Sequence, residues 1–415
     1  MSALVLRVGR RTFRSLRRHR NYRLFFSGQV VSLIGTWMQN IALAWLVIEL
    51  SGSALAIGAL AFCRFMPFLV FGLVAGVVVD RFDSRRLLVL TQGTAMLVSA
   101  ALAVVTLAGV ATLPVVYALA AIGGMILVVD APARQTLTYQ MVGPAELQNA
   151  VALNSGLSYG SRVLGPAIAG LLIAVVGTGL CFVINAISFL AVLASLRLLR
   201  PEELTAVVRQ ETRVVAGIRE GIAWAMHAPI ARTVLTVITI VSTFGFNFHV
   251  LVPLLASQTL EVGAETFGIL SAAFGLGALA GALVTASLRE ASTRAFVGGG
   301  IGFSLVMLAL ALADSVAVGL VLLFALGVSF SLLSASANAL VQLAAPDHLR
   351  GRVISLYMFA FAGLAPIGGL VAGWLSELGG TPLAFGVAGA AGLVVATWAF
   401  RELAVAQPRT AASDA

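Results

Sequence analysis

The chain of 415 residues is too apolar and too poor in charge to be a soluble protein. Hydrophobic residues make up 60% of it and charged residues only 10%, whereas a soluble domain carries about 25% charged residues. The formal net charge of +9 comes from 26 arginines, with no lysine, against 17 acidic residues. These arginines mark the ends of apolar segments instead of clustering on a solvated face, which excludes a nucleic-acid-binding protein. The two cysteines, Cys63 and Cys181, lie in apolar runs and offer no disulfide framework or metal quartet.

Twelve apolar stretches follow one another along the chain, and each is long enough for a membrane-crossing helix of about 20 residues. Uniformly apolar runs of this length lack the alternation of a β-barrel, and helices satisfy every backbone hydrogen bond in lipid. We therefore predict an all-α membrane protein. The stretches lie at about 24–50, 54–79, 87–110, 114–137, 147–176, 178–198, 230–258, 264–288, 295–313, 316–343, 353–377 and 381–401.

Arginines occupy every second connection between these stretches. The odd-numbered connections carry only acidic residues, such as Glu261, Asp314 and Glu377. By the positive-inside bias, we expect a multi-pass protein of the inner (plasma) membrane with both termini and the central link in the cytoplasm. The arginines lie at 7–23, 81–86, 197–219, 289–294, 350–352 and 401–409.

The second half of the chain repeats the pattern of the first. Proline-led motifs open the fifth stretch at Pro144 and the eleventh at Pro346, and Pro166 and Pro366 precede glycine-rich turns at a similar interval. Such duplication is typical of secondary transporters, whose binding site lies between the halves near the middle of the membrane. We therefore predict twelve transmembrane helices in two pseudo-symmetric six-helix bundles. The predicted parts are a cytoplasmic Arg-rich arm, an N-terminal bundle, a cytoplasmic link, a C-terminal bundle and a disordered cytoplasmic tail, at 1–21, 22–198, 199–229, 230–402 and 403–415.

Four stretches of the sequence resemble known transporters. Residues 76–86 are similar to the loop signature between helices two and three of the major facilitator superfamily, except that Asp83 replaces a glycine, which loosens the predicted turn. Residues 22–39, 130–135 and 346–353 resemble the enterobactin-exporter and macrolide-efflux type of permease within that superfamily. The resemblance covers nearly the whole chain and implies the major facilitator fold, with proton-driven export by alternating access.

The resemblance implies a cytoplasmic gate at the loop signature. Gly76 lets helix two approach a neighbouring helix closely. We expect Asp80 to meet the positive N-terminal end of helix eleven, near Arg350 and Arg352, when the cytoplasmic side is closed. The alternative is a positively charged anchor with incidental acidic residues. The predicted gate residues are Gly76, Asp80, Arg81, Arg85, Arg86, Arg134, Arg350 and Arg352.

Glycines around a proline in the fifth stretch resemble the antiporter signature of exporting members of the superfamily. Proline removes a backbone donor and kinks a helix, while glycine permits close contact with another helix. The alternative is ordinary helix packing. The predicted hinge residues are Gly160, Gly165, Pro166 and Gly170, and their expected partners on helix eight are Gly268, Gly275, Gly277 and Gly281.

Polar side chains recur at helical spacing on single faces of several predicted helices. They are costly in lipid unless they face water or other helices. Helices one, seven and ten line the cavity in the superfamily that the sequence resembles. For any single residue, a hydrogen bond between helices is the alternative. The predicted pathway residues are Gln29, Ser32, Thr36, Gln39, Asn40, Arg64, Asn154, Ser158, Arg162, Thr239, Thr243, Asn247, Ser331, Ser334 and Asn338.

Two of these residues, Arg64 and Arg162, lie near the middle of their predicted helices. An unpaired charge there costs at least about 2.5 kcal/mol, so each arginine should face the cavity or a partner. That partner is an anionic substrate group, a proton-coupling carboxylate, or a set of carbonyls and hydroxyls. The proton-coupling candidates are Asp130, Glu49 and His249. Asp130 is the best of them, although Arg134 four residues later would make a local pair.

These features predict a secondary active transporter that exports small molecules, such as drugs or siderophore-like metabolites, by proton antiport. The alternatives are an uptake symporter or a lipid flippase on the same fold. A membrane-embedded enzyme is disfavoured because the histidines and cysteines are scattered, and a sensor because the sequence shows no soluble signalling domain. We expect a small-molecule substrate, the lipid bilayer and protons as partners, a functional monomer, and no cofactor, metal or nucleic acid.

Overall fold

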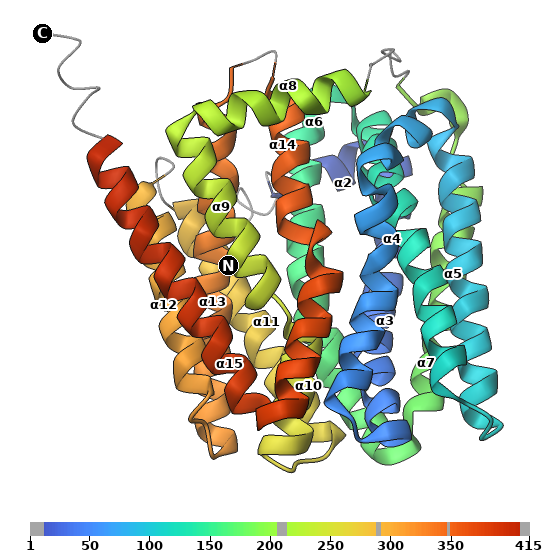
Figure 1. Ribbon diagram of the computed structural model, residues 1–415. Helices are drawn as coiled ribbons and strands as arrows, with labels where there is room; N and C mark the ends of the chain where they lie inside the picture. The colour runs from blue at the N-terminus through green and yellow to red at the C-terminus, as the bar shows by residue number, and fades with distance from the viewer. Residues whose placement is uncertain (1–11, 206–213, 288–291, 347–348, 407–415) are drawn as a thin grey trace, which may run out of the picture.

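The computed structural model describes residues 12–205, 214–287, 292–346 and 349–406, apart from the side chains of 73–80, 214–219 and 404–406. The described chain is almost entirely helical and contains no strand, and its helices stand side by side in one bundle (Figure 1). This follows from the composition, because a chain surrounded by lipid must satisfy its backbone N–H and C=O groups internally.

The first half of the chain forms the helices on the right of Figure 1. Its longest helix, α6, is broken at Gly143, whose φ of 67° lies in the left-handed region that glycine adopts without strain. The two parts of α6 therefore run in opposite directions as two crossings. The helices are α2 (Arg14–Arg18), α3 (Arg20–Ser51), α4 (Ala54–Arg81), α5 (Ser84–Leu107), α6 (Leu113–Val176) and α7 (Thr178–Arg197).

The second half follows the short helices η1 (Pro201–Glu203) and α8 (Val214–His227), of which α8 lies across the top of the bundle in Figure 1. Its last helix, α15, is broken at Gly380 in the same way as α6, with a φ of 72°. The elements are α9 (Pro229–Phe244), α10 (Phe248–Leu254), the π-helix η2 (Leu255–Thr259), α11 (Ala264–Ser287), α12 (Thr293–Leu310), α13 (Val316–Ala344), α14 (Arg350–Met358), the π-helix η3 (Phe359–Gly363) and α15 (Ala365–Ala406).

The predicted all-α fold with twelve crossings is confirmed. Ten stretches of the described chain are long and apolar enough to cross a membrane. Two of them contain the breaks at Gly143 and Gly380 and count as two crossings each. The elements α9, α10 and η2 together make one crossing, and so do α14, η3 and the first part of α15.

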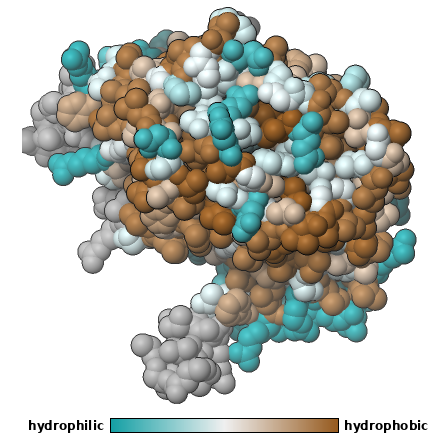
Figure 2. Space-filling model, turned by 90° about the horizontal axis from the view of Figure 1, so that it is seen from below, coloured by the Kyte–Doolittle hydropathy of each residue, from teal (hydrophilic) through white to brown (hydrophobic). Residues whose placement is uncertain are grey.

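The outer surface of the bundle is apolar, as a lipid-facing surface must be. On α5, Leu90, Leu97 and Val104 follow one another at intervals of seven residues and are 66%, 65% and 66% exposed. In water, such an exposed stripe would be a liability for aggregation. Figure 2 views the molecule from the bottom of Figure 1 and shows mostly apolar residues, with a few hydrophilic side chains scattered among them.

The two ends of the bundle differ. We call the end that carries α2, α8 and the last turns of α15 the link end (Figure 1). The opposite end, which carries the turns at Gly52 and Gly177, is called the far end. An even number of crossings places the first and last described helices at the same end, as observed.

The short helix α2 is tied to the turn between the two parts of α6. Ser15 Oγ donates a hydrogen bond to Asn149 Oδ1 at 2.7 Å. Arg14 and Arg18 form ion pairs with the buried Glu146 at 2.6 and 2.9 Å, while both arginines remain largely exposed. Because exposed charges are screened by water, the buried polar contacts contribute more than the ion pairs to holding α2 in place.

We expect the substitution Tyr22→Phe to lower the free energy of unfolding by about 1 kcal/mol. Tyr22 is fully buried, and its hydroxyl is hydrogen-bonded to the carbonyl of Ala150 and to Asn154 Oδ1, each at 3.0 Å. Without the hydroxyl, the buried carbonyl of Ala150 and the partly buried Asn154 lose the donor that they share. Thermal unfolding in detergent measures the effect. Tyr139→Phe is the control, because the Tyr139 hydroxyl has no hydrogen bond within the described chain, and equal unfolding temperatures for the two variants would contradict the prediction.

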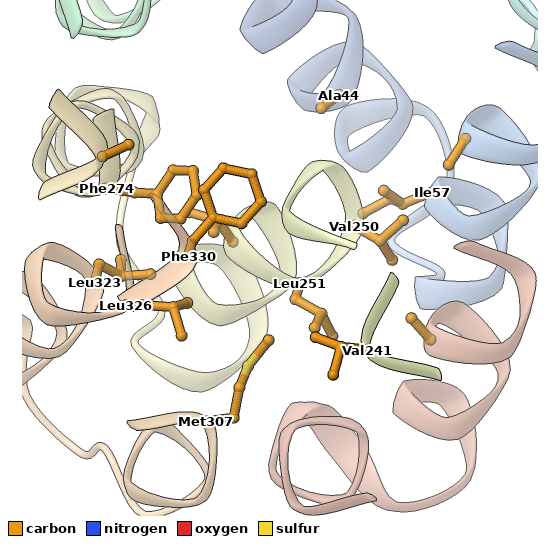
Figure 3. Close-up of a cluster of buried hydrophobic side chains, with 14 of the residues drawn as sticks. Ala44, Ile57, Val241, Val250, Leu251, Phe274, Met307, Leu323, Leu326 and Phe330 are labelled. Carbon is orange, nitrogen blue, oxygen red and sulfur yellow. The ribbon is translucent and has the colours of Figure 1, made fainter. Parts of the chain in front are cut away.

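An apolar core joins the two halves. Phe274 of α11 and Phe330 of α13 lie with ring centroids 5.8 Å apart, and Val250 of α10 lies beside Ile57 of α4 (Figure 3). All four side chains belong to one continuous cluster of buried residues. The short helix α10 therefore packs between the two halves in the lower part of the bundle in Figure 1.

The turn before α5 is capped by Asp83. Its Oδ1 accepts a hydrogen bond from the backbone N of Arg86 at 2.8 Å, which satisfies one of the N–H groups at the start of the helix. We expected from the sequence that Asp83, in place of a glycine, loosens this turn. That expectation is wrong, because glycine has no side chain to make such a cap.

Candidate functional site

A cavity of about 1070 Å³ lies between the two halves. Helices α3 to α7 of the first half, with α13 and η3 of the second half, contribute side chains to it. Its lining runs from Arg64 and Arg162, in the middle of their helices, to Gln29, Tyr139 and Gln342 near the link end. The described lining residues stop short of the turns at the far end. The cavity is therefore reached from the link end.

A smaller cavity of about 210 Å³ continues the large one into the second half. Both cavities are lined by Asn40, Arg64, Arg162, Phe330 and Phe361. The two arginines thus stand where a polar cavity meets an aromatic one. Further residues of the smaller cavity include Trp37, Phe65, Phe246, Asn247, Phe248, His249 and Phe274.

Most of the predicted pathway residues line one of these cavities, but Thr239, Thr243 and Ser331 line neither. Ser331 Oγ donates to the carbonyl of Ala278, and Thr243 Oγ1 donates to that of Thr239, each at 2.7 Å. The Ser331 bond joins α13 to α11, and the Thr243 bond lies within α9. Because none of the three residues lines a cavity, we leave them out of the proposed pathway. The residues that line a cavity are Gln29, Ser32, Thr36, Gln39, Asn40, Arg64, Asn154, Ser158, Arg162, Asn247, Ser334 and Asn338.

Gln39 on the cavity wall belongs to a polar network inside the first half. Its Oε1 accepts hydrogen bonds from Ser99 Oγ at 2.6 Å and from Asn185 Nδ2 at 2.7 Å. These bonds connect α3, α5 and α7. Gln39 therefore both lines the cavity and holds three helices together. The two interpretations of a polar residue in these helices, a pathway residue or an interhelical hydrogen bond, both apply to it.

Asp130 also lies on the cavity wall, with both carboxylate oxygens engaged. Oδ1 accepts hydrogen bonds from Thr91 Oγ1 at 2.8 Å and from Gln92 Nε2 at 2.6 Å. Oδ2 forms an ion pair with Arg134, four residues later. Arg134 in turn donates to Gln29 Oε1. The charge of Asp130 is thus balanced by Arg134 within the first half, and Arg134 makes no contact there with the opposite half.

The other two proton-coupling candidates have different surroundings. Glu49 is exposed near the end of α3 and lines neither cavity. His249 lies on the wall of the smaller cavity, where it is accessible. Its ring is stacked with that of Trp37 at 6.3 Å between centroids and lies 5.5 Å from that of Phe65. Of the two, His249 is the one placed to meet a molecule in the cavity.

One membrane-crossing helix is interrupted beside the smaller cavity. Residues 245–247 separate α9 from α10, and Asn247 Nδ2 donates to the carbonyl of Thr243 at 2.8 Å. The π-helix η2 follows α10. Interrupted helices free backbone groups for binding and are typical of the sites of transporters. The sequence signal for this break was Gly245 within an otherwise apolar run.

Two arginines of the predicted gate have partners that do not bridge the halves. Arg85 Nε donates to the carbonyl of Leu196 at 2.8 Å, which satisfies an unpaired carbonyl at the end of α7. Arg352 of α14 forms an ion pair with Glu220 of α8. At the link end, these side chains therefore leave the cavity entrance open.

The other gate residues are described only in part. Arg81, Arg86 and Arg350 are exposed at the link end. The surroundings of Gly76 and the side chain of Asp80 lie outside what the structure describes, and so does the predicted contact of Asp80 with the start of helix eleven. The gate remains a prediction.

Glycines bring α6 and α11 into backbone contact at the far end. A Cβ atom added to Gly170 would lie 2.7 Å from the carbonyl oxygen of Ala264, and one added to Gly268 would lie 2.5 Å from that of Pro166. Both distances are too short for a side chain. The predicted hinge segment and helix eight therefore form a tight crossing between the halves.

The other predicted hinge contacts differ. Gly165 packs closely on Trp37 of α3, whereas a Cβ on Gly160 would meet only open space. Gly277 and Gly281 approach α13 of their own half instead of α6. The expectation that Gly277 and Gly281 pack against helix five is wrong. Gly277 follows Gly275 by two positions, and residues two positions apart on a helix point to different sides.

A second crossing, between α4 and α15, seals the same end. A Cβ on Gly373 would lie 2.8 Å from the carbonyl oxygen of Ala54, and one on Gly58 would lie 2.7 Å from that of Gly369. Beside it, Glu377 accepts hydrogen bonds from Ser53 Oγ at 3.0 Å and from the backbone N of Leu55 at 3.2 Å. The far end is thus closed by matching contacts in the two halves of the pseudo-symmetric fold.

Sequence reasoning missed the aromatic wall of the smaller cavity. Phe246 lies 4.8 Å from Phe330, and Phe248 lies 4.2 Å from Phe274, between ring centroids. These rings come from the 245–247 break, α10, α11 and α13, and nothing in the sequence distinguishes them from lipid-facing phenylalanines. Among the described residues, no group of three or more His, Cys, Asp or Glu side chains is arranged to hold a metal ion.

Two halves of membrane-spanning helices around a polar cavity define a transporter of the major facilitator superfamily. The chain belongs to the family described as "Transmembrane secretion effector", whose model matches residues 12–415. This confirms the superfamily predicted from the loop signature. The family and the relatives below are transporters, not enzymes.

Two of the curated relatives match most of the chain, and a third matches a shorter part of it. The staphyloferrin A transporter of Staphylococcus aureus is 28% identical over 88% of this chain and 92% of its own length. The multidrug efflux pump Tap of Mycolicibacterium fortuitum is 28% identical over 85% of this chain and 88% of its own. Macrolide efflux protein A of Streptococcus pyogenes is 29% identical over 39% of this chain and 40% of its own.

Solved structures share the fold at low identity. A mutant of the peptide transporter POT superimposes with a TM-score of 0.75 at 14% identity, covering 94% of this chain and 95% of that one. A mutant of the nucleoside transporter NupG gives a TM-score of 0.70 at 13% identity, covering 92% and 98%. At these identities the likeness concerns the fold alone.

Proposed function

We propose that this protein exports small molecules across the inner membrane by alternating access and proton antiport. The observation that carries the proposal is the cavity between the halves, which is reached from the link end and sealed at the far end by the crossings of α6 with α11 and of α4 with α15. A central site open to one side and closed to the other is one of the two states that alternating access requires.

The charge distribution supports an orientation with the link end in the cytoplasm. Basic residues of α2 and of the starts of α3 and α5 gather at this end, whereas Glu49 and Glu377 lie at the far end. This is the asymmetry expected from the positive-inside bias. The structure then corresponds to an inward-facing state, in which a molecule enters the cavity from the cytoplasm.

Export of drug-like or siderophore-like molecules is supported by the relatives, two of which carry the word efflux in their names and one the word staphyloferrin. The proposed pathway consists of the twelve predicted residues that line the cavities. The proposed hinge is the kinked part of α6 around Pro166, where Gly165 and Gly170 pack against α3 and α11. We propose that the protein works as a monomer.

The proposed gate closes the link end in the opposite state. In the structure Arg352 is held by Glu220 of α8. On closure, Arg352 would exchange this partner for Asp80, which would then lie at the start of helix eleven. Such an exchange gives two discrete arrangements of one side chain, which is what a two-state gate needs.

Asp130 is the proposed proton carrier. Its carboxylate lies on the cavity wall, and its ion pair with Arg134 exists only while it is ionised. Protonation would release Arg134, and with it the hydrogen bond to Gln29 of α3. A proton entering the site would thereby change the contact between two helices that line the pathway.

We expect Asp130→Asn to abolish proton-driven efflux but to retain exchange of substrate for substrate. Exchange needs only the reorientation of loaded protein, whereas antiport needs the unloaded protein to carry a proton back. The measurement uses liposomes, with uptake driven by a pH gradient and counterflow without one, on a substrate chosen from a panel of metabolites and antibiotics. A protonophore should stop wild-type transport; continued gradient-driven transport by Asp130→Asn would exclude Asp130 as the carrier.

The same assay separates the alternatives. An uptake symporter would accumulate substrate in the direction of proton flow, and a flippase would move labelled lipid. Transport that ignores the proton gradient would reject proton antiport as the driving reaction.

A further inference from the structure

Two arginines on the walls of both cavities have no carboxylate partner within the described chain. Arg64 of α4 and Arg162 of α6 line both cavities. Within the described ranges, neither forms a hydrogen bond or an ion pair with the protein, in contrast to Arg134, which is paired with Asp130. Their N–H groups are therefore available to a molecule in the cavity.

The backbone at each arginine is fixed by close helix packing. A Cβ added to Gly124 would clash with the carbonyl oxygen of Arg64, and one added to Gly275 would lie 2.8 Å from that of Arg162. The helices touch at these points without intervening side chains. The backbone from which each arginine extends is therefore held at the cavity wall.

Aromatic rings cover one face of each guanidinium. The Cζ atom of Arg162 lies 4.8 Å from the ring centroid of Trp37, and that of Arg64 lies 5.9 Å from that of Phe65. A guanidinium stacked on a ring keeps its in-plane N–H donors free, in the geometry that matches a carboxylate with two parallel hydrogen bonds. The imidazole of His249 lies against both of these rings and adds a nitrogen to the same spot.

The charge of the cavity walls favours an anion. Among the described lining residues, Asp130 is the acidic one, and Arg134 balances it. Arg64 and Arg162 then leave two uncompensated positive charges in a region of low dielectric constant, where charges interact more strongly than in water. An organic cation would be repelled, and a bound anion would compensate the charge.

The surroundings also indicate the rest of the ligand. Beside the two arginines lie the rings of Phe246, Phe248 and Phe330, which line the smaller cavity. Such rings bury apolar or aromatic groups. A molecule that fits both features carries an acidic group at one end and an apolar body next to it.

We propose that Arg64 and Arg162 together bind the carboxylate of an amphipathic organic acid, whose apolar body lies against the phenylalanines of α10, α13 and the 245–247 break. This names a substrate class for the proposed export function and rests on it. The assignment of both arginines to one site follows from their shared position at the junction of the two cavities.

The test measures binding to purified wild-type protein in detergent with three dansyl probes that differ in charge. N-dansylglycine is anionic, N-dansylglycinamide is neutral and N-dansylethylenediamine is cationic. We expect the carboxylate to bind at least about tenfold more tightly than the amide, and the cation to bind most weakly. Equal affinities, or preference for the cation, would overturn the proposal.

Two substitutions assign the preference to the arginines. Arg64→Gln and Arg162→Gln should each weaken binding of N-dansylglycine by about tenfold or more while leaving the amide nearly unchanged. Arg17→Gln removes the same charge from an exposed position of α2, outside the cavities and the predicted gate, and should have no effect. Thermal unfolding verifies that the variants are folded. If both arginine variants keep the full preference for the carboxylate, the site is not where we place it.

The results that would reject the proposed export function differ from those that would reject the anion site. Carboxylate binding that depends on both arginines, in a protein that moves no probe across liposomes, would leave the anion site intact and reject export. Proton-driven transport of neutral or cationic compounds with no preference for carboxylates would reject the anion site and leave export standing.

Discussion

Replacing Gly170 by leucine is expected to abolish transport while the protein still folds and inserts. In the structure, a Cβ at this position would lie 2.7 and 2.9 Å from two carbonyl oxygens of α11. Even alanine over-packs such a contact, at a cost of about 1–3 kcal/mol. This shifts the population away from the state with a closed far end by about 5- to 150-fold. Leucine excludes that state.

Gly160 supplies the matched control for this substitution. It belongs to the same glycine pattern of α6, but a Cβ added there meets nothing within 4 Å. Gly160→Ala should therefore transport nearly as well as the wild type, whereas Gly170→Ala should be slow and Gly170→Leu inactive. Transport rates in liposomes, at equal protein content, give the comparison. Equal rates for the two alanine variants would show that the α6–α11 crossing does not open and close during transport.

A reversible cross-link across the far end is expected to stop transport. Ser53 and Glu377 belong to different halves, and Ser53 Oγ lies 3.0 Å from Glu377 Oε2. A direct disulfide needs Cβ atoms about 3.8 Å apart, and the glutamate oxygen lies three bonds beyond its Cβ, so the two thiols are joined by a short bis(methanethiosulfonate) reagent. This reagent should bridge the double variant Ser53→Cys, Glu377→Cys, in a background in which Cys63 and Cys181 are replaced by alanine. Because the proposed cycle needs the far end to open, the cross-linked protein should transport nothing, and a reductant should restore the rate.

The single-cysteine variants control for the loss of the native hydrogen bonds. Each should keep its rate after treatment with the same reagent, since no second thiol is near it. Binding of a probe from the link end should persist in the cross-linked double variant, because the cavity remains open there. Full transport by a quantitatively cross-linked protein would contradict alternating access through the far end.

Much of the fold was predictable because membrane-spanning helices are specified locally. A crossing needs about 20 apolar residues, and this requirement can be counted along the chain without knowing any contact. Gly143 and Gly380 each separate two crossings. In the sequence they fall in gaps between apolar stretches, so these two breaks could also be counted without knowing any contact. The family followed from the short loop signature around Asp83.

The sequence predicted the candidate site only as a set of polar helix faces. Helical spacing placed Gln39, Ser331 and Arg162 among residues that turn away from lipid. It did not distinguish Ser331, which donates to a carbonyl of α11, from Arg162, which lines both cavities. The break at residues 245–247 and the aromatic wall beside it were missed, since they depend on how separate helices meet.

The sequence by itself determined the number of crossings, the duplicated halves and the polar face of each helix, because lipid penalises each misplaced polar group independently of the rest of the fold. Only the tertiary structure decided which polar residues share a cavity, which glycines touch across the halves, and that Arg64 and Arg162 lack a carboxylate within the described chain. Those properties depend on the rotation and pairing of helices far apart in sequence. In lipid, close packing sets that pairing more than apolarity does.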